Sequence, residues 1–500
     1  MTDTPLKVYD ARWETGDFSR MEIEKLFRST CIYAEKLNID TIVISRDARL
    51  GCPEVVEIAV KTARSSGFTV YLCQDPISTP QSYYNTLRIT ENHPNTMGWT
   101  ITASHNPSSY IGVKFVISPV RAIGMESGPF DGLTDIEKIY FNGNRGDIHF
   151  KNSHYGKLFL INYSTDYVAD SLEWASVSRN ELQGMNVILN PMNGSAGTEV
   201  YNTLMAAGVN ITGLNLIVNG AFPAGAPNPT SKGKMNRAIE LAGNQKNAIV
   251  IGLDGDGDRI IFGDKKGLFT AGTSMIPLLS RLKVIDPSTL GSALCDPKVD
   301  PSSLDNWSRL GYTPILFRNG HSQIKDYMRS RDISVAAEES GHFYHRIQKN
   351  NLTVYCENSL ITILLFLKSI KENPVLLSDM RAIEDSVFTS REINYQFTDD
   401  MVRNKALNTA VSLLQKDNAV ISSKTEEGID LQGIAFLKGV NPRTKRLEGK
   451  DWYSGFHRIS TNEKSVARFY FSSGSESMCN KLTNEIRKVC ENDLSGIRIE

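Results

Sequence analysis

Short runs of β-branched and apolar residues alternate with amphipathic stretches over most of this 500-residue chain. Residues 41–44 form an apolar run, residues 55–63 repeat apolar side chains at helical spacing, and residues 68–73 are again mostly apolar. Such alternation is typical of parallel strands covered by helices. Because it recurs over 185–253 and 276–370, the sequence predicts an α/β fold made of three related α/β domains, although no strict sequence repeat accompanies them.

The alternation weakens after Pro374, where polar residues increase and strands such as 466–471 stand beside helices such as 478–490. This change of pattern predicts a separate α+β domain at the C-terminal end. A chain of this length exceeds the size at which one hydrophobic core keeps growing. We therefore expect four domains, at residues 1–155, 156–267, 268–374 and 375–500.

Charge and composition exclude several classes of protein. Lysine and arginine number 55 against 56 acidic residues, and no long run of one sign favours nucleic acid or a membrane surface. The N-terminal segment lacks the pattern of a secretory signal, and the longest apolar run, 360–367, is too short to cross a bilayer. The 7 scattered cysteines include no CxxC pair, which argues against a disulfide framework. We expect a cytoplasmic protein that binds neither nucleic acid nor membrane.

The segment Thr-Ala-Ser-His-Asn-Pro, residues 102–107, directly follows a predicted strand. A serine at the end of a strand can present its hydroxyl in the region outside the sheet where α/β proteins bind ligands. Taken alone, Ser104 is accounted for at least as well by a turn or a helix cap, since Ser, Asn and Pro all favour helix starts. The segment lacks the G-x-S-x-G elbow of a hydrolase.

Three carboxylates, Asp254, Asp256 and Asp258, alternate with glycines after another apolar strand. Such a loop can bend closely around one hard cation. An EF-hand is excluded because Arg259 stands where that loop needs glycine, and Lys265 where it needs glutamate. Three unpaired carboxylates would repel one another, so a cation is expected. Since Mg²⁺ usually completes its ligand shell with phosphate or water, a phosphate partner is implied.

Two further segments suit a sugar and its phosphate. Residues 338–342, Glu-Glu-Ser-Gly-His, follow a strand expected at 333–336 and offer hydrogen-bonding groups for sugar hydroxyls. A helix N-terminus or a surface turn accounts for this string equally well. Residues 458–463, Arg-Ile-Ser-Thr-Asn-Glu, can surround a phosphate with guanidinium, side-chain and backbone donors.

In their order and spacing, these four segments resemble the α-D-phosphohexomutase superfamily. In that family a TASHNP loop carries a phosphoserine, a DGDxDR loop binds Mg²⁺, an E-x-S-G-H loop contacts sugar hydroxyls, and an arginine-started loop holds the substrate phosphate. Tyr9-Asp10-Ala11-Arg12 and Arg46-Asp47-Ala48-Arg49 resemble lesser motifs of the family. The resemblance implies three related α/β domains and a smaller α+β domain around a central cleft, each domain contributing one of the four loops.

The resemblance also implies a role for individual residues. Ser104 would carry the phosphoryl group and join the three aspartates as a ligand of one Mg²⁺ ion. Lys114, Arg12 and His105 would be catalytic, and Arg259 would neutralise charge on the moving phosphoryl group. The substrate would contact Tyr9, Lys298, His321, Lys325, Glu338, Ser340, His342, Arg458, Ser460, Thr461 and Asn462.

The activity implied is that of an isomerase which interconverts hexose 1-phosphate and hexose 6-phosphate. A hexose 1,6-bisphosphate would serve as intermediate and activator. The string at 338–342 looks more like the phosphomannomutase/phosphoglucomutase branch than the amino-sugar branches, which favours mannose or glucose phosphates. The alternatives are a phosphoglucosamine or acetylglucosamine phosphate mutase, a catalytically silent phosphosugar-binding member, and a metal-dependent phosphatase. Sugar phosphates are the expected partners of a monomer or homodimer.

Overall fold

The computed structural model describes residues 4–125, 127–142, 154–460 and 463–499. Two compact units make up the chain. The first comprises Met1–Leu268, Gly320–Ser334 and Ser340–Lys371, and the second comprises Phe269–Asn319, Val335–Glu339 and Glu372–Glu500. The four domain boundaries expected from the sequence stay a prediction.

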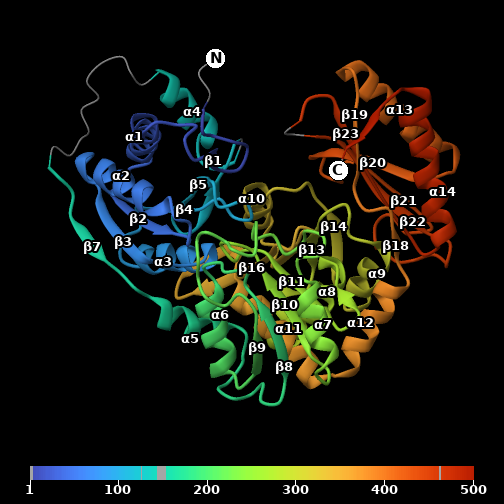
Figure 1. Cartoon of the computed structure of the whole chain (residues 1–500), viewed down its shortest axis with the longest axis horizontal. Helices are drawn as coiled ribbons and strands as arrows, with labels where there is room; N and C mark the ends of the chain where they lie inside the picture. Colours follow the sequence, from blue (N-terminus) through green and yellow to red (C-terminus); the bar gives the residue numbers. More distant parts are fainter. Residues whose placement is uncertain (1–3, 126, 143–153, 461–462, 500) are drawn as a thin grey trace. The chain divides into compact units, whose positions relative to one another are not determined.

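The first unit alternates strands and helices along most of its length (Figure 1). Its strands are β1 (Ala11–Glu14), β2 (Thr41–Arg46), β3 (Thr69–Pro76), β4 (Thr96–Ile101), β5 (Tyr110–Ile117), β6 (Arg121–Ile123), β7 (Leu158–Leu160), β8 (Asn186–Asn190), β9 (Asn210–Gly213), β10 (Ile249–Leu253), β11 (Ile260–Asp264), β12 (Gly267–Leu268), β16 (Phe343–Lys349) and β17 (Leu352–Glu357). Its helices are α1 (Arg20–Lys36), α2 (Cys52–Ser65), α3 (Thr79–Thr90), α4 (Leu133–Asn142), α5 (Ser164–Trp174), α6 (Gly197–Ala206), α7 (Asn236–Gly243), α10 (His321–Arg331) and α11 (Ser359–Glu372).

The first sheet has the strand order β1-β5-β4-β2-β3-β7, with β6 pairing with β5. Its strands β2, β3, β4 and β7 run parallel, whereas β5 pairs antiparallel with β4 and β1 pairs antiparallel with β5. Helices α1 and α2 lie on one side of these strands and α3 on the other (Figure 1). Every residue of β4 is buried as a result. Phe27 of α1 stacks on Trp99 of β4 at a ring distance of 5.1 Å within this core.

Helix α3 begins where it does because Ser78 accepts a hydrogen bond from the Gln81 amide and Pro80 favours the first turn. The second sheet has the order β12-β11-β10-β8-β9, and β10 lies parallel to β8 and antiparallel to β11. Strands β16 and β17 of the first unit pair as an antiparallel hairpin. The loop after β4 and the loop between β10 and β11 carry two of the four segments that the sequence singled out for chemistry.

The second unit combines three parallel strands with an antiparallel sheet. Its elements are α8 (Ala271–Ile285), η1 (Pro287–Thr289), β13 (Ser292–Cys295), α9 (Pro301–Arg309), β14 (Thr313–Leu316), β15 (Val335–Ala337), α12 (Val375–Asp385), β18 (Phe388–Thr389), β19 (Ile393–Gln396), α13 (Asp400–Lys416), β20 (Val420–Lys424), β21 (Asp430–Lys438), β22 (Tyr453–Ile459), β23 (Val466–Ser473), α14 (Glu476–Arg487), η2 (Lys488–Asp493) and β24 (Ile497–Ile499).

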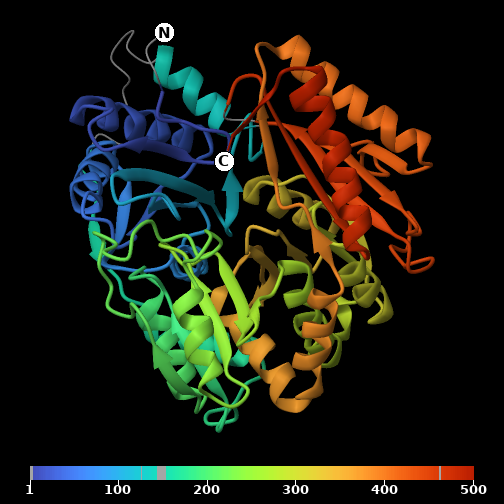
Figure 2. The same ribbon diagram turned by 45° about the vertical axis from the view of Figure 1, so that its right-hand side comes forward.

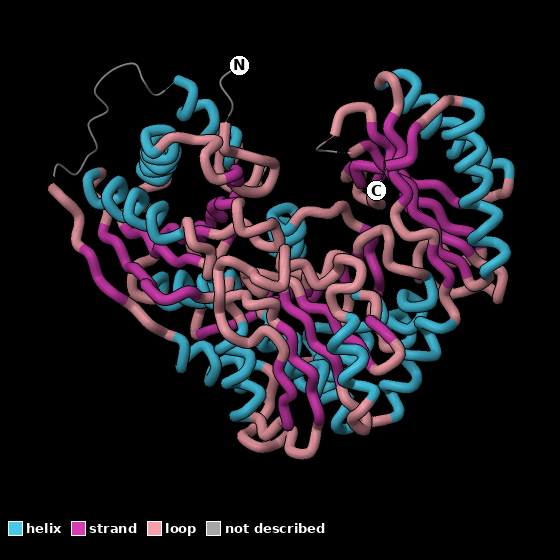
Figure 3. Tube along the Cα trace, in the orientation of Figure 1, coloured by secondary structure: helices cyan, strands magenta, loops and turns pink. Residues whose placement is uncertain are grey.

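Strand β13 lies between β14 and β15, parallel to both. The antiparallel sheet has the order β20-β21-β22-β23-β19-β24, and β18 also pairs with β23. Helices α13 and α14 pack on one face of it (Figures 2 and 3). Their apolar side chains form a buried cluster with Phe469 and Phe471 of β23. These features confirm the predicted α/β architecture and the α+β character of the last segment.

Some expected element bounds were wrong. The helix expected to run from Met478 to Cys490 begins at Glu476 and ends at Arg487, after which η2 is a π-helical turn. The strand expected to start at Ile333 starts at Val335, because the Ile333 amide donates to the Met328 carbonyl at the end of α10. All 7 cysteines are buried free thiols. Within the described ranges no helix has the length and apolarity needed to cross a membrane.

Candidate active site

The serine segment forms a buried turn after β4. Ser104 has a left-handed backbone conformation, with φ of 50°, and is only 3% exposed. The Thr102 hydroxyl accepts a hydrogen bond from the Ser104 amide at 2.9 Å and donates one to Asp47 at 2.7 Å. A non-glycine residue in this conformation indicates a backbone held by its surroundings. Ser104 therefore does not cap a helix.

The Arg49 side chain stabilises the turn that contains Ser104. Its guanidinium is fully buried, pairs with Asp47 at 3.0 Å, and donates to the carbonyls of Ser104 at 2.6 Å and Asn106 at 2.8 Å. It also donates to the carbonyls of Pro107 and Tyr110. One planar guanidinium thus satisfies four backbone carbonyl groups between Ser104 and Tyr110.

We expect replacement of Arg49 by Met to lower the free energy of unfolding by about 3–5 kcal/mol, because Asp47 would remain as a buried, uncompensated carboxylate. Urea unfolding would measure the loss. Arg46→Met is the matched control: Arg46 is half-buried and donates to two carbonyls, so about 1 kcal/mol or less is expected. Equal losses in the two variants would contradict this role for Arg49.

The aspartate loop lies between β10 and β11 in the same unit. Asp254 and Asp256 are 0% exposed and Asp258 is 2% exposed. One carboxylate oxygen from each of the three lies within 4.8 Å of the others. Gly255 is required here because a Cβ atom would lie 2.6 Å from the Ser104 carbonyl oxygen. Gly257 has φ of 68° and leaves no room for a Cβ beside Ala196.

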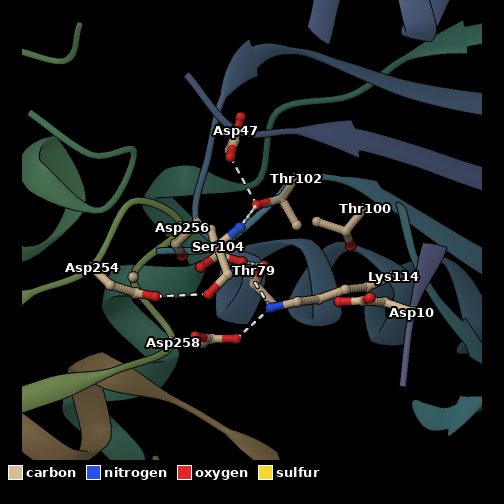
Figure 4. A network of polar contacts seen from close by, with 12 residues as sticks. Asp10, Asp47, Thr79, Thr100, Thr102, Ser104, Lys114, Asp254, Asp256 and Asp258 are labelled. Atoms are coloured by element: carbon tan, nitrogen blue, oxygen red, sulfur yellow. Dashed lines mark hydrogen bonds and ion pairs between the residues drawn. The ribbon is translucent and has the colours of Figure 1, made fainter. Parts of the chain in front are cut away.

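Ser104 and the aspartates form one hydrogen-bonded network (Figure 4). The Ser104 hydroxyl donates to Asp254 Oδ2 at 2.8 Å. Lys114 of β5 bridges the other two carboxylates, with its Nζ 2.8 Å from Asp256 Oδ2 and 2.5 Å from Asp258 Oδ2. The first residue of α3, Thr79, donates its hydroxyl to Asp256 Oδ2 at 2.6 Å and its amide to the Asp256 carbonyl at 2.8 Å. The positive end of α3 therefore meets the carboxylate cluster.

These contacts set the protonation of the network. Burial would lower the pKa of Lys114, but Asp256 and Asp258 raise that pKa well above its ordinary value, so Nζ is an ammonium. Burial would raise the pKa of Asp256, but Lys114 and the Thr79 hydroxyl hold it below its usual range. Burial, together with the charges of Asp256 and Asp258, raises the pKa of Asp254 well above its usual range. One lysine therefore does not compensate all three carboxylates.

The cluster fits a metal ion. Asp256 Oδ1 and Asp258 Oδ1 are buried and have no hydrogen-bond partner among the described residues. Buried carboxylate oxygens left in this state are costly unless a cation engages them. Three closely spaced carboxylates form the oxygen-rich ligand set that hard divalent cations prefer.

Arg259 and His342 lie beside this cluster. The Arg259 Nε group donates to His342 Nε2 at 3.2 Å, so the neutral imidazole carries its proton on Nδ1. Burial, then the charge of Arg259, lowers the pKa of His342 to about 3. Its Nδ1 faces Asp258 Oδ1 at 3.7 Å and Glu357 Oε1 at 3.8 Å. Arg259 therefore fixes the tautomer of a neutral histidine.

The two other predicted catalytic side chains also lie at the serine turn. Arg12 donates to Asp10 at 2.5 Å and to the Asn106 side chain at 3.2 Å. His105 Nδ1 lies 3.3 Å from Ser104 Oγ, and burial, with the charges of Arg259 and Arg12, lowers the pKa of His105 to about 2. His105 is thus a neutral neighbour of the serine hydroxyl and a weak base.

Three predicted substrate contacts come from the N-terminal segment and from α10. The rings of Tyr9 and His321 meet edge to face at 5.9 Å. Lys325 is 2% exposed and donates to Glu357 at 2.9 Å and to the Tyr83 hydroxyl at 3.3 Å, so its ammonium is engaged in a buried ion pair. The sequence missed Glu357 and Tyr83; the only signal for Glu357 was a carboxylate at the end of an apolar strand.

The remaining predicted contacts, Ser340 apart, belong to the second unit. Lys298 and Arg458 both approach one carboxylate, that of Glu392, at 3.6 and 3.7 Å. Ser460 donates to Glu463 at 2.8 Å, and Glu338 is 4% exposed. Ser340, in the turn before β16, is half-buried. Thr461 and Asn462 lie outside the described residues.

Three family models match the chain. They are described as phosphoglucomutase/phosphomannomutase alpha/beta/alpha domain I, matched by residues 5–127, domain II, matched by 165–267, and domain III, matched by 304–385. The chain belongs to the α-D-phosphohexomutase superfamily.

Members of this superfamily resemble the chain over most of its length. A phosphomannomutase of Escherichia coli strain K12 is 27% identical over 374 residues, which cover 72% of this chain and 76% of that protein. Phosphohexose mutases of Xanthomonas campestris are 26% identical over 406 residues, or 80% and 84% of the two chains. The phosphoglucomutase parafusin of Paramecium, in its open form, has the same fold, with a TM-score of 0.78, 15% identity, and 98% and 95% of the two chains covered.

Proposed function

We propose that this phosphohexomutase interconverts hexose 1-phosphate and hexose 6-phosphate through a phosphoserine at position 104. The observation that carries the proposal is the hydrogen bond from Ser104 Oγ to Asp254, because it places a buried serine hydroxyl beside a carboxylate cluster that fits a metal ion. Mg²⁺ is the ion we propose for Asp254, Asp256, Asp258 and the phosphorylated Ser104. When bound it would neutralise phosphoryl charge and orient the transfer.

In the proposed reaction the P–O bond to Ser104 Oγ breaks as a P–O bond to a sugar hydroxyl forms. The product is a hexose 1,6-bisphosphate, which returns its other phosphoryl group to Ser104. The proton of the sugar hydroxyl must reach Ser104 Oγ, and Lys114, whose Nζ pairs with Asp256 and Asp258 in the same network as Ser104, is the side chain that we propose to relay it. Arg12 and His105 would orient the reacting groups, and Arg259 would stabilise charge on the phosphoryl group.

We propose mannose and glucose phosphates as substrates. The names of the curated relatives support this choice, and the N-acetylphosphoglucosamine mutase of Aspergillus fumigatus is less similar in structure, with a TM-score of 0.52. We propose as substrate contacts Tyr9, Lys298, His321, Lys325, Glu338, Ser340, His342, Arg458, Ser460, Thr461 and Asn462. Of these, Arg458, Ser460, Thr461 and Asn462 would hold the substrate's phosphate group. We also propose a cytoplasmic location, which the 7 free thiols support.

Turnover on mannose 1-phosphate, glucose 1-phosphate and glucosamine 6-phosphate tests the proposal. We expect isomerisation of at least one of the first two, with little release of inorganic phosphate, because the bisphosphate is retained and water is excluded. Activity on the amino sugar alone would overturn the substrate choice. Net phosphate release without isomerisation would indicate a phosphatase instead.

A further inference from the structure

A single carboxylate of the second unit, that of Glu392, attracts three cations from three different elements. Arg468 of β23 donates to Glu392 Oε1 at 2.6 Å. Lys298, in the loop after β13, lies 3.6 Å from Oε2, and Arg458 of β22 lies 3.7 Å from the same oxygen. Glu392, which directly precedes β19, is only 26% exposed. The sequence singled out Lys298 and Arg458 but gave no reason to connect them with Glu392 or Arg468.

Strand register explains why an anion is needed here. Arg458 and Arg468 stand directly opposite each other in the β22–β23 pair, and Arg468 stands opposite Asn394 of β19. Arg468 alternates with Phe469, which faces α13 and α14, so the arginines lie on the face that these helices leave open. Like charges directly opposite in a sheet repel. Glu392 compensates that repulsion.

The three cations are bound to Glu392 in two different ways. Arg468 is held firmly, since its other terminal nitrogen donates to Glu463 at 2.6 Å and to Ser460 at 3.3 Å. Among the described residues, the side chains of Lys298 and Arg458 make no hydrogen bond and are drawn to Glu392 by charge alone. Their N–H donors therefore remain available to an incoming anion.

We propose that Glu392 is an internal counter-ion of the phosphate-binding site, with which the substrate's phosphate group competes for Lys298 and Arg458. The inference rests on the proposed function, which places a phosphate at Arg458 and Ser460. A mutase that passes through a bisphosphate must bind each of two phosphate groups in turn and release it again. A fixed negative charge beside the site lowers its affinity for a dianion and so makes this exchange possible.

The test replaces Glu392 by Gln, which keeps an acceptor for Arg468 but removes the charge. We expect inorganic phosphate, titrated by calorimetry, to bind roughly five- to thirtyfold more tightly than to the native protein, because one repulsion of a dianion is removed. In turnover, KM for the hexose phosphate should fall while kcat does not rise. Glu491→Gln is the matched control, since the Glu491 side chain is also 26% exposed but pairs with Arg487 and with none of the three cations at Glu392; about twofold or less is expected.

Unchanged or weaker phosphate binding by E392Q would overturn the proposal and leave Glu392 a structural residue. The tighter binding must also disappear when Arg458→Met is added, which assigns the binding to this site. If E392Q does not fold, Glu392→Asp is the second variant, because its shorter side chain moves the carboxylate away from Lys298 and Arg458 by one methylene. This variant should also bind phosphate more tightly than the native protein. Equal or weaker binding would contradict the proposal. Phosphate binding does not require turnover, so a failure of the proposed mutase activity would be seen separately.

Discussion

Replacement of Ser104 by Ala is expected to reduce mutase turnover by roughly 10⁴-fold or more, the scale seen when a covalent nucleophile is removed. The reason is that alanine cannot carry the phosphoryl group between the two positions of the sugar. The fold should survive, because Arg49 holds the turn through backbone carbonyls that the substitution leaves in place. Thermal unfolding would check this.

Intact-mass measurement tests directly for a phosphoserine at position 104. The native protein, incubated with hexose 1,6-bisphosphate, should gain one phosphoryl group that S104A does not gain. Ser109→Ala makes the same change in the same loop at an exposed hydroxyl that bonds Glu14, and should retain both activity and phosphorylation. Turnover by S104A comparable to that of the native protein would remove Ser104 from the mechanism.

Asp256→Asn is expected to lower turnover by roughly 10³-fold, the order of effect of losing one preorganised electrostatic contact to the reacting group. The substitution removes a carboxylate ligand of the proposed Mg²⁺ and breaks one of the two ion pairs that hold Lys114. Chelation of divalent cations should have an effect of similar size on the native enzyme. Added Mg²⁺ should restore the native enzyme but not the variant.

Binding of Mn²⁺, followed by electron paramagnetic resonance, provides a second measurement that does not depend on activity. The native protein should bind one ion tightly and D256N should bind it far more weakly. Asp264→Asn is the control, because Asp264 lies at the end of β11 and accepts backbone amides from the following turn. Equal Mn²⁺ affinity in native protein and D256N would place the ion elsewhere.

Local sequence patterns predicted most of the fold. Apolar runs and helical periodicity located β2, α2, β4 and β10, because strand and helix repeats are properties of neighbouring residues. The ends of elements were less predictable, as at β15 and α14, where hydrogen bonds at the neighbouring turn decide the boundary. The order of four short motifs placed the chain in its superfamily.

The site residues also divide into those that the sequence indicated and those whose role only the structure revealed. The sequence by itself determined that Ser104 and three aspartates stand in loops after apolar strands, and that such a serine has no local reason to be reactive. Only the tertiary structure brought Ser104 to Asp254, 150 positions away along the chain, and placed Lys114 between Asp256 and Asp258. Glu392 and Arg468 gave no local signal, whereas Arg49 stood only in a lesser family motif and Glu357 only at the end of an apolar strand. Their roles depend on burial and on partners from other elements, because desolvation and nearby charge decide what an ionisable side chain does.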